Sequence, residues 1–405
     1  MLRSSLGFHT ITLFLRLNYG EVEKLIKHFC TYRKHTGLIR MLIPQPKPEK
    51  GWREYTPMYN GRRIILPLHL KIIYCGKDQG IRWVIRSDRR NEMYSEYTVE
   101  ATINPKILGG VTDYVTASNC NDLDTAIRKF NRISKGISPV LGTFENYTFK
   151  RIDYCLNFDV DEITPGCTSE QVMNLIRRGD VPPHFKERTE YDSISHRMKS
   201  KPDSFYLICK STTINCYRKS VELQRRIEKG HRKGSSSVTQ EMVDAAQNII
   251  RFEVQCKYPK VYNLSRRTKD TDVPICNKLQ NLFGYHACLE IINHYYGVTI
   301  GAGDWFSLSA AQKIIKLQRF NAQKTERLMK VLREVNQCRS LASAKKAHQG
   351  SDLAAFKQTL KDLADIGINP VTIPREWGIA HIPNLLHSFN DMDLARVACP
   401  ELRLI

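Results

Sequence analysis

Polar and apolar side chains alternate in several short stretches of the first two thirds of the chain. The most regular alternation covers residues 147–161, and shorter ones cover 7–17, 94–104 and 250–256. A period of two residues is typical of a β-strand with one apolar and one polar face. These stretches therefore predict a mainly antiparallel sheet.

Two more strands are predicted around a small polar turn. Residues 205–210 and 214–219 are strand-like, and the turn at 211–213 between them is typical of a β-hairpin. On the second strand, alternation would place Tyr217 and Lys219 on one face.

The pattern changes near residue 270. Apolar residues then recur at helical spacing over 279–296, 309–338 and 351–366. The predicted fold class is α+β, with a mainly antiparallel sheet domain at 1–268 and a smaller helical domain at 269–405.

Two stretches of the sheet part lack a clear period. Prolines and glycines at 44–61 predict a loop, and residues 179–202 are interpreted as a polar, basic connector.

The charge balance adds a partner to this picture. Lys and Arg number 62 against 41 Asp and Glu, a formal net charge of +21. Such an excess favours a polyanion such as nucleic acid, because phosphate contacts dominate that kind of affinity. The alternative is a merely solubilising surface. The candidate phosphate-binding side chains around the predicted hairpin, helix and loop are Arg218, Arg225, Arg226, Arg232 and Lys233.

Other classes of protein are disfavoured. No apolar run is long enough to span a bilayer, and no secretory signal pattern begins the chain, so we expect a cytoplasmic protein without a membrane partner. The twelve cysteines show no zinc spacing. No P-loop, G-x-S-x-G or G-x-G-x-x-G motif is present, which argues against the enzymes that use them.

One short pattern occurs twice in the alternating strands. Arg151-Ile152-Asp153 and Arg251-Phe252-Glu253 share the order arginine, hydrophobe, carboxylate. If the two strands lie in one sheet, Asp153 and Glu253 can present carboxylates to one cleft. Two such ligands, completed by water and a substrate phosphate, suit Mg²⁺ or Mn²⁺. The alternative is two arginine–carboxylate ion pairs on a solvated face.

Tyr217 is the candidate nucleophile. The pKa of a tyrosine hydroxyl is near 10, so attack on phosphorus requires a base, a metal or a positive charge nearby. Lys219 is expected to supply positive charge from the same strand face. The rival pair Tyr295-Tyr296 lies among apolar residues and is interpreted as packing.

These blocks resemble a known family. The chain is similar, in ordered patches, to the replication initiators of filamentous phages, the gene II protein family, and its end resembles the phage X protein. The patches are Lys150-Arg151-Ile152-Asp153, the run from Cys216 to Gln224, Ile250-Arg251-Phe252-Glu253, the run from Val99 to Leu108, and residues 360–386.

The resemblance implies that the first domain is catalytic and nicks and rejoins DNA. In that family a tyrosine cuts the plus strand at the origin of double-stranded replicative DNA and stays on the 5′ phosphate during rolling-circle synthesis. The implied partners are circular double-stranded DNA, the displaced single strand, and a host helicase and polymerase. Tyr217 falls at the nucleophile position, Asp153 and Glu253 at the carboxylate positions, and Glu100 and Glu222 are weaker candidates. Arg151 and Arg251 would then contact DNA.

Two alternatives stay open. The chain can be a plasmid initiator or a relaxase that uses the same chemistry on another replicon. It can also be a non-catalytic DNA-binding protein, in which case Tyr217 would have no chemical role.

Overall fold

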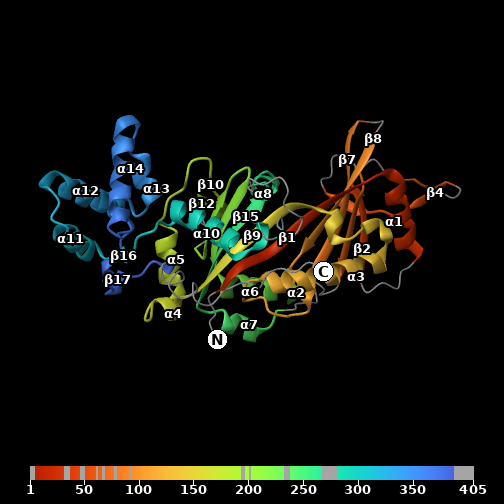
Figure 1. Cartoon of the computed structure of the whole chain (residues 1–405), viewed down its shortest axis with the longest axis horizontal. Coiled ribbons are helices and arrows are strands. Elements are labelled where there is room, and N and C mark those ends of the chain that lie inside the picture. Colours follow the sequence, from red (N-terminus) through yellow and green to blue (C-terminus); the bar gives the residue numbers. More distant parts are fainter. Residues whose placement is uncertain are drawn as a thin grey trace.

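The structure, a computed structural model, consists of a large β-sheet with helices packed around it (Figure 1). It describes residues 5–31, 37–45, 51–60, 63–65, 69–76, 80–91, 94–192, 197–199, 202–231, 238–266, 279 and 281–386.

One large sheet dominates the described part of the chain, and every neighbouring strand pair in it is antiparallel. The predicted α+β class is confirmed. The eleven strands, in spatial order, are β10 (Lys186–Glu187), β13 (Ser204–Ile208), β14 (Thr212–Arg218), β15 (Ile249–Lys257), β9 (Thr148–Asp159), β1 (Ser5–Leu17), β8 (Tyr94–Ile103), β7 (Ile81–Asn91), β6 (Lys71–Gly76), β2 (Gly37–Pro44) and β3 (Trp52–Glu54).

The apolar face of this sheet is covered by helices. In α3 (Cys120–Ile137), the ring of Phe130 packs 5.7 Å from that of Trp83 on β7. In α10 (Tyr285–Thr299), Tyr296 packs 5.4 Å from Phe252 on β15. Aromatic pairs at these distances stabilise beyond the area they bury. The helix α1 (Tyr19–Thr31) contributes to the same core cluster.

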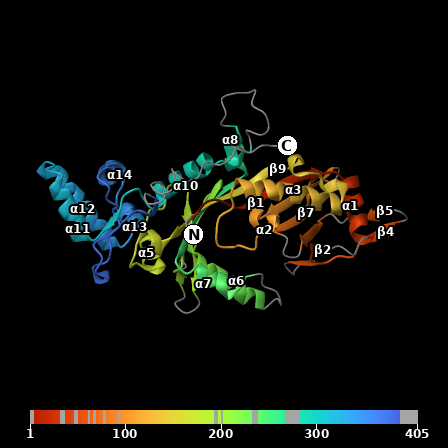
Figure 2. The same ribbon diagram turned by 60° about the horizontal axis from the view of Figure 1, so that its bottom comes forward.

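The opposite face of β14 and β15 is partly covered as well. Leu223 of α6 (Lys219–His231) and Val243 of α7 (Gln240–Ala245) form a smaller apolar cluster with Val115. In Figures 1 and 2, α10 and α6 lie on opposite sides of these strands. The central strands therefore carry helices on both faces, although their sequences alternate.

The helical part differs from the prediction in two ways. The stretch 309–338 is not one helix, because α11 (Leu308–Leu317) ends before α12 (Ala322–Cys338) begins. Arg319 lies in the left-handed region at φ 54°, and the Asn321 side chain caps α12 by accepting from the Lys324 amide.

The second difference concerns α10, which was expected in the helical domain but packs on the sheet. The helices that lie at one end of the molecule (Figure 1) are α11 and α12 with α13 (Leu341–Lys346) and α14 (Gly350–Asp365). The expected boundary at residue 268 falls in a stretch outside the described residues and stays a prediction.

Short elements complete the described chain, and two expectations are corrected by them. The loop predicted at 44–61 contains β3 and β4 (Met58–Asn60), and the connector at 179–202 contains β10, β11 and β12. Strands this short follow pairing partners rather than any sequence period. The remaining elements are β5 (Arg63–Ile65), β11 (Glu190–Asp192), β12 (Arg197–Lys199), β16 (Trp305–Phe306), β17 (His381–Ile382), α2 (Pro105–Gly109), α4 (Val160–Ile163), α5 (Ser169–Ile176), α8 (Tyr258–Ser265) and the 3₁₀ turns at Pro139–Leu141, Phe144–Asn146 and Arg375–Trp377. None of the described helices combines the length and apolar character that a membrane span requires.

Gly7, on β1, allows the backbone at Ser118 to lie close against this strand. A Cβ at Gly7 would lie 2.0 Å from the carbonyl oxygen of Ser118, and the next residue, Phe8, forms a backbone bridge with Ser118. We expect Gly7→Ala to lower the free energy of unfolding by about 2–4 kcal/mol, because backbone must move to admit the methyl group. Urea unfolding followed by circular dichroism measures this.

Gly136 is the matched control for this prediction. It lies exposed near the end of α3 with nothing within 4 Å of its Cβ position. Gly136→Ala should be neutral or stabilising by up to about 1 kcal/mol. Equal effects of the two substitutions would contradict the close approach at Gly7.

Candidate active site

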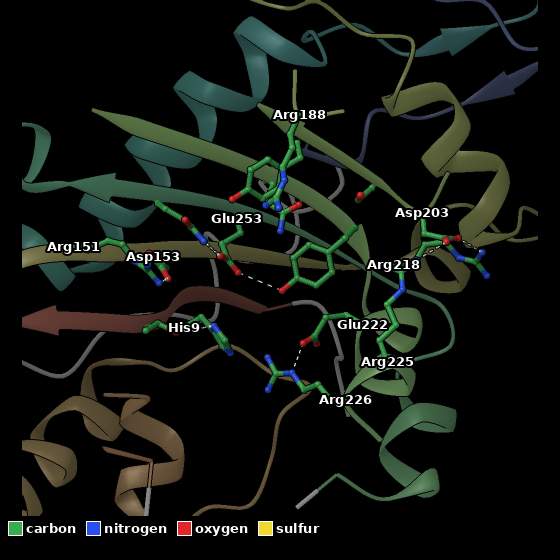
Figure 3. Close-up of a pocket in the computed structure, with 16 residues that line it drawn as sticks. His9, Arg151, Asp153, Arg188, Asp203, Arg218, Glu222, Arg225, Arg226 and Glu253 are labelled. Carbon is green, nitrogen blue, oxygen red and sulfur yellow. Dashed lines mark hydrogen bonds and ion pairs between the residues drawn. The ribbon is translucent and has the colours of Figure 1, made fainter. Parts of the chain in front are cut away.

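A pocket of about 360 Å³ opens on the polar face of β13, β14, β15, β9 and β1 (Figure 3). Its lining is strongly charged, and arginines outnumber carboxylates. The acidic residues are Asp153, Asp203, Glu222 and Glu253, and the arginines are Arg151, Arg188, Arg218, Arg225 and Arg226.

The register of the strands explains why these side chains meet. Glu253 on β15 lies opposite Asn215 on β14, and Asp153 on β9 lies opposite Gln255 on β15. Directly paired residues of antiparallel strands share a face, so Asp153 and Glu253 are diagonal neighbours on it. The two arginine–carboxylate strands are thus adjacent, and both carboxylates face one cleft.

Tyr217 on β14 lines the pocket. Its side chain is 8% exposed, and its hydroxyl donates to Glu253 Oε2 at 3.3 Å. Burial, and then the negative charge of Glu253, raise the pKa of Tyr217 well above its usual value of 10. The phenol is therefore protonated here, and Glu253 is the proton acceptor to which it is hydrogen-bonded.

Lys219 is close to Tyr217 but not in the predicted way. It is the first residue of α6 rather than a strand residue, so the expected shared strand face is wrong. Its ammonium is fully buried, lies 6.0 Å from the centroid of the Tyr217 ring, and donates to Glu222 Oε2 at 2.7 Å. Burial, and then the positive charge of Arg251, lower the pKa of Lys219 to about 7.

Glu222 links α6 to the pocket. It accepts from Lys219 and also pairs with the guanidinium of Arg226, as Figure 3 shows. Burial acts to raise the pKa of Glu222, but the charges of Lys219 and Arg226 outweigh it, so the pKa is lowered. Glu222 thus holds two cations beside Tyr217.

Asp153 is buried, contrary to the alternative of an ion pair on a solvated face. It is 1% exposed and accepts from Arg151 Nη2 at 2.6 Å through Oδ2. Burial, and then the charge of Glu253, raise the pKa of Asp153 to about 7, although Arg151 acts in the opposite direction. Its Oδ1 has no hydrogen-bond partner among the described residues.

His9 also lines the pocket, and sequence reasoning missed it. The pairing of β1 with β9 shifts between Phe8 and Thr10, so His9 occupies a β-bulge. Bulges re-aim side chains and are frequent beside active sites. Burial, and then the charge of Arg251, hold the pKa of His9 well below 6.5, so the ring is neutral. The only feature of the sequence that could have pointed to His9 is the interruption of the alternating pattern at His9-Thr10.

Arg251 does not reach the pocket surface, which corrects its expected contact with DNA. It is fully buried, and it donates to Asn157 Oδ1 at 2.7 Å and to the Val115 carbonyl at 2.5 Å. Its charge lies beneath the pocket and acts on Tyr217 and Lys219. Arg251 therefore positions the loop at Val115 and supplies buried positive charge.

The other predicted arginines are distributed around the rim. Arg218 and Arg225 both donate to Asp203, at 3.3 and 3.2 Å, so this carboxylate holds two guanidinium groups at the pocket edge. Arg232 and Lys233 lie outside the described residues.

Glu100 is not brought to the site. It lies on β8, pairs with Lys150, and is absent from the pocket lining. The rival tyrosines, Tyr295 and Tyr296, also lie outside the pocket. They are on α10, against the apolar face of the sheet, and pack there as expected.

The donor set can be tested against Mg²⁺ or Mn²⁺. Within the described ranges, no three His, Cys, Asp or Glu side chains gather closely enough to hold a metal ion by themselves. Mg²⁺ commonly takes one or two carboxylates and completes its shell with water and substrate phosphate. The unpartnered Oδ1 of Asp153, beside Glu253, fits that smaller set.

A basic surface leads away from the pocket along the sheet. A row of cross-strand pairs runs from Arg82 on β7 to Arg151, through one threonine on each of the two strands between them. Lys71 and Arg86, a cross-strand pair, lie on the same face. The pKa of Lys71 is lowered, first by burial and then by the charges of Arg86 and Arg82, which indicates a local excess of positive charge.

Comparison with known proteins gives little. No family model matches the chain, and no curated protein matches it. Among solved structures, the chain is similar to the rolling circle replication initiator protein from Geobacillus stearothermophilus, with 11% identity over 69% of this chain and 85% of that chain and a TM-score of 0.27. Similarity at this level does not establish a shared fold, so the function of this chain is inferred from its own pocket.

The buried neutral state of His9 has a consequence for stability. Because its folded pKa lies below 6.5, the unfolded chain binds one more proton than the folded chain once the pH falls under that value. Wild type should lose stability relative to His9→Gln by up to about 1.4 kcal/mol per pH unit below about pH 6.5. Urea unfolding of both proteins across a pH series measures the difference, and parallel curves would contradict a neutral His9.

Proposed function

We propose that this chain is a tyrosine DNA endonuclease and strand transferase that initiates rolling-circle replication. It would nick one strand of circular double-stranded DNA at the origin and later rejoin the displaced single strand. One observation carries the proposal: the Tyr217 hydroxyl donates to Glu253 in a pocket that also holds Asp153 and is rimmed by arginines.

The side chains support a transesterification. Glu253 accepts the Tyr217 proton, and the phenolate oxygen attacks the phosphorus. The P–O3′ bond breaks as the 3′ oxygen takes up a proton from solvent. The cut strand then stays bonded to Tyr217 through its 5′ phosphate. Because the phosphodiester energy is kept in the phosphotyrosine, rejoining requires no nucleotide, which agrees with the absence of a P-loop.

The burial of Tyr217 would keep its hydroxyl protonated until a DNA phosphate is bound. With a pKa well above 10, the phenol does not ionise in the free protein. A phosphate bound by Arg151, Arg218 or Arg226 would bring the electrophile to the hydroxyl, and these guanidinium groups would stabilise the charge of the pentacovalent phosphorus.

Asp153 and Glu253 are the residues that would hold Mg²⁺ or Mn²⁺. Such an ion supplies Lewis-acid polarisation of the scissile phosphate when bound. Arg151 orients one Asp153 oxygen at 2.6 Å, and the other has no hydrogen-bond partner among the described residues.

The basic sheet face supports the expected DNA partner. Lys71, Arg82 and Arg86 would contact the phosphates of duplex DNA and guide it toward Arg151 at the pocket. The 3′ hydroxyl released by the nick would prime a host polymerase behind a host helicase. A phage or plasmid origin, or a relaxase substrate, would suit this chemistry equally.

Tyr217→Phe tests the nucleophile. Supercoiled DNA of the replicon that encodes the protein is incubated with protein and Mg²⁺ and then run on gels with and without protease. We expect wild type to produce nicked circles with protein bonded to the 5′ end, and Tyr217→Phe to lose this product by at least about a thousandfold, because phenylalanine has no nucleophile.

Tyr295→Phe is the matched control, since it removes a hydroxyl from the other face of the sheet. Nicking that persists in Tyr217→Phe would move the nucleophile elsewhere. Tight DNA binding without nicking under any metal would favour the non-catalytic DNA-binding protein.

The carboxylates give an independent prediction. Asp153→Asn and Glu253→Gln should each reduce the cleavage rate by at least about a hundredfold, since they remove metal-binding charge and the Tyr217 proton acceptor. Asp153→Asn should also raise the Mg²⁺ concentration required for half-maximal rate.

Glu100→Gln makes the same chemical change outside the pocket, where Glu100 pairs with Lys150. It should keep the rate within about twofold. An equal loss in Glu100→Gln would mean that Glu100 moves to the metal, as the resemblance implies.

A further inference from the structure

The pocket contains a second tyrosine, Tyr206, that the chemistry above does not use. It lies on β13 directly opposite Asn215, and Asn215 lies directly opposite Glu253. Tyr206, Asn215 and Glu253 therefore form one row across three strands of the polar face. All three line the pocket.

Tyr206 and Tyr217 are close on this face. Tyr217 is two residues beyond Asn215 on β14, so it is the diagonal cross-strand neighbour of Tyr206. Diagonal neighbours are about 7–8 Å apart, which lets two aromatic side chains reach into one site. No other described tyrosine lines this pocket.

The surroundings of the two phenols differ. Tyr217 is 8% exposed and hydrogen-bonded to Glu253, whereas Tyr206 is half-buried. The Arg188 guanidinium lies 5.4 Å from the centroid of the Tyr206 ring, and the Arg188 amide donates to the Tyr206 carbonyl at 2.8 Å. Figure 3 shows Arg188 on the opposite side of Glu253 from Arg226.

Arg151 supplies a second positive charge near Tyr206. Arg151 and Tyr206 line the same pocket, where Arg151 is held by its hydrogen bond to Asp153. A phenolate on Tyr206 would thus share the pocket with two guanidinium groups, which also suit the charge of a phosphate under attack.

We propose that Tyr206 is a second nucleophile, which cuts the regenerated origin junction while Tyr217 still carries the first 5′ phosphate. The inference rests on the proposed nicking and joining activity. Once Tyr217 is bonded to DNA, a further cut in the same pocket requires another oxygen. The alkyl hydroxyls of Thr10 and Ser204 are far less acidic than a phenol, so Tyr206 is the better nucleophile.

The step balances without a cofactor. The Tyr206 hydroxyl loses its proton to solvent, its oxygen bonds the phosphorus of the new junction, and the P–O3′ bond breaks as the 3′ oxygen takes up a proton. The released 3′ hydroxyl then attacks the phosphorus on Tyr217. A P–O3′ bond forms, the bond to Tyr217 breaks, and Tyr217 regains a proton. The number of phosphodiester bonds is conserved, and a closed circle is released.

The experiment uses the full chain and two short single-stranded oligonucleotides that span the mapped nick and carry different labels. The first oligonucleotide forms the Tyr217 adduct, which is purified. The second is then added with Mg²⁺, and joined product and new adduct are followed over time. Mass spectrometry of tryptic peptides identifies the tyrosine that carries each label.

Wild type should carry the first label on Tyr217 and the second on Tyr206. Tyr206→Phe should form the first adduct within about twofold of the wild-type rate, which also shows that it is folded. Its second cut and its joined product should fall by at least about a hundredfold, since the attacking oxygen is missing. Tyr262→Phe, an exposed tyrosine on α8, is the matched control and should behave as wild type.

Other outcomes separate the two levels of inference. A Tyr206→Phe adduct that cuts and joins the second oligonucleotide at the wild-type rate would overturn the role of Tyr206 alone. So would a second label found on Tyr217 of another copy of the chain. If wild type forms no adduct with either oligonucleotide, the proposed nicking function itself fails.

Discussion

The pairing of β15 with β9 is the constraint on which the rest of the structure depends. These strands are about ninety residues apart along the chain, yet they lie side by side with Gln255 opposite Asp153. Because side chains alternate with a period of two, a slip of one residue would turn Glu253 toward the α10 core and Phe252 toward the pocket. The apolar contacts of Phe252 with Tyr296 therefore hold the register that places the carboxylates.

Burying the charged side chains of this polar face costs free energy. Arg251 and Lys219 are fully buried, and Asp153 nearly so, which requires partners for each charge. The site supplies such partners. Arg251 donates to Asn157, Lys219 donates to Glu222, and Asp153 accepts from Arg151.

A few polar atoms at this face are left unmatched. Among the described residues, His9 Nε2, Asp153 Oδ1 and Asn215 Oδ1 have no hydrogen-bond partner. Buried groups without partners lower stability, and they concentrate where a ligand completes the site. A pocket in which arginines outnumber carboxylates suits a polyanionic ligand, in agreement with the net charge of +21.

The sequence by itself determined the local part of this result. Strict alternation over 147–161 and 250–256 is enough to separate Asp153 and Glu253 from the core, and the α+β class follows from where alternation yields to helical spacing. Alternation says nothing about which strands are neighbours, because register between distant strands is set by packing.

Only the tertiary structure decided that α6 covers the polar face and buries Lys219, that Arg251 lies beneath the pocket, and that Glu100 stays outside it. The same holds for His9, aimed by a bulge that exists only in the pairing of β1 with β9, and for Tyr206, whose neighbour across the sheet is the strand of Tyr217. The hydrophobic period depends on residues that are neighbours along the chain, whereas the site is formed by residues that are neighbours only in space.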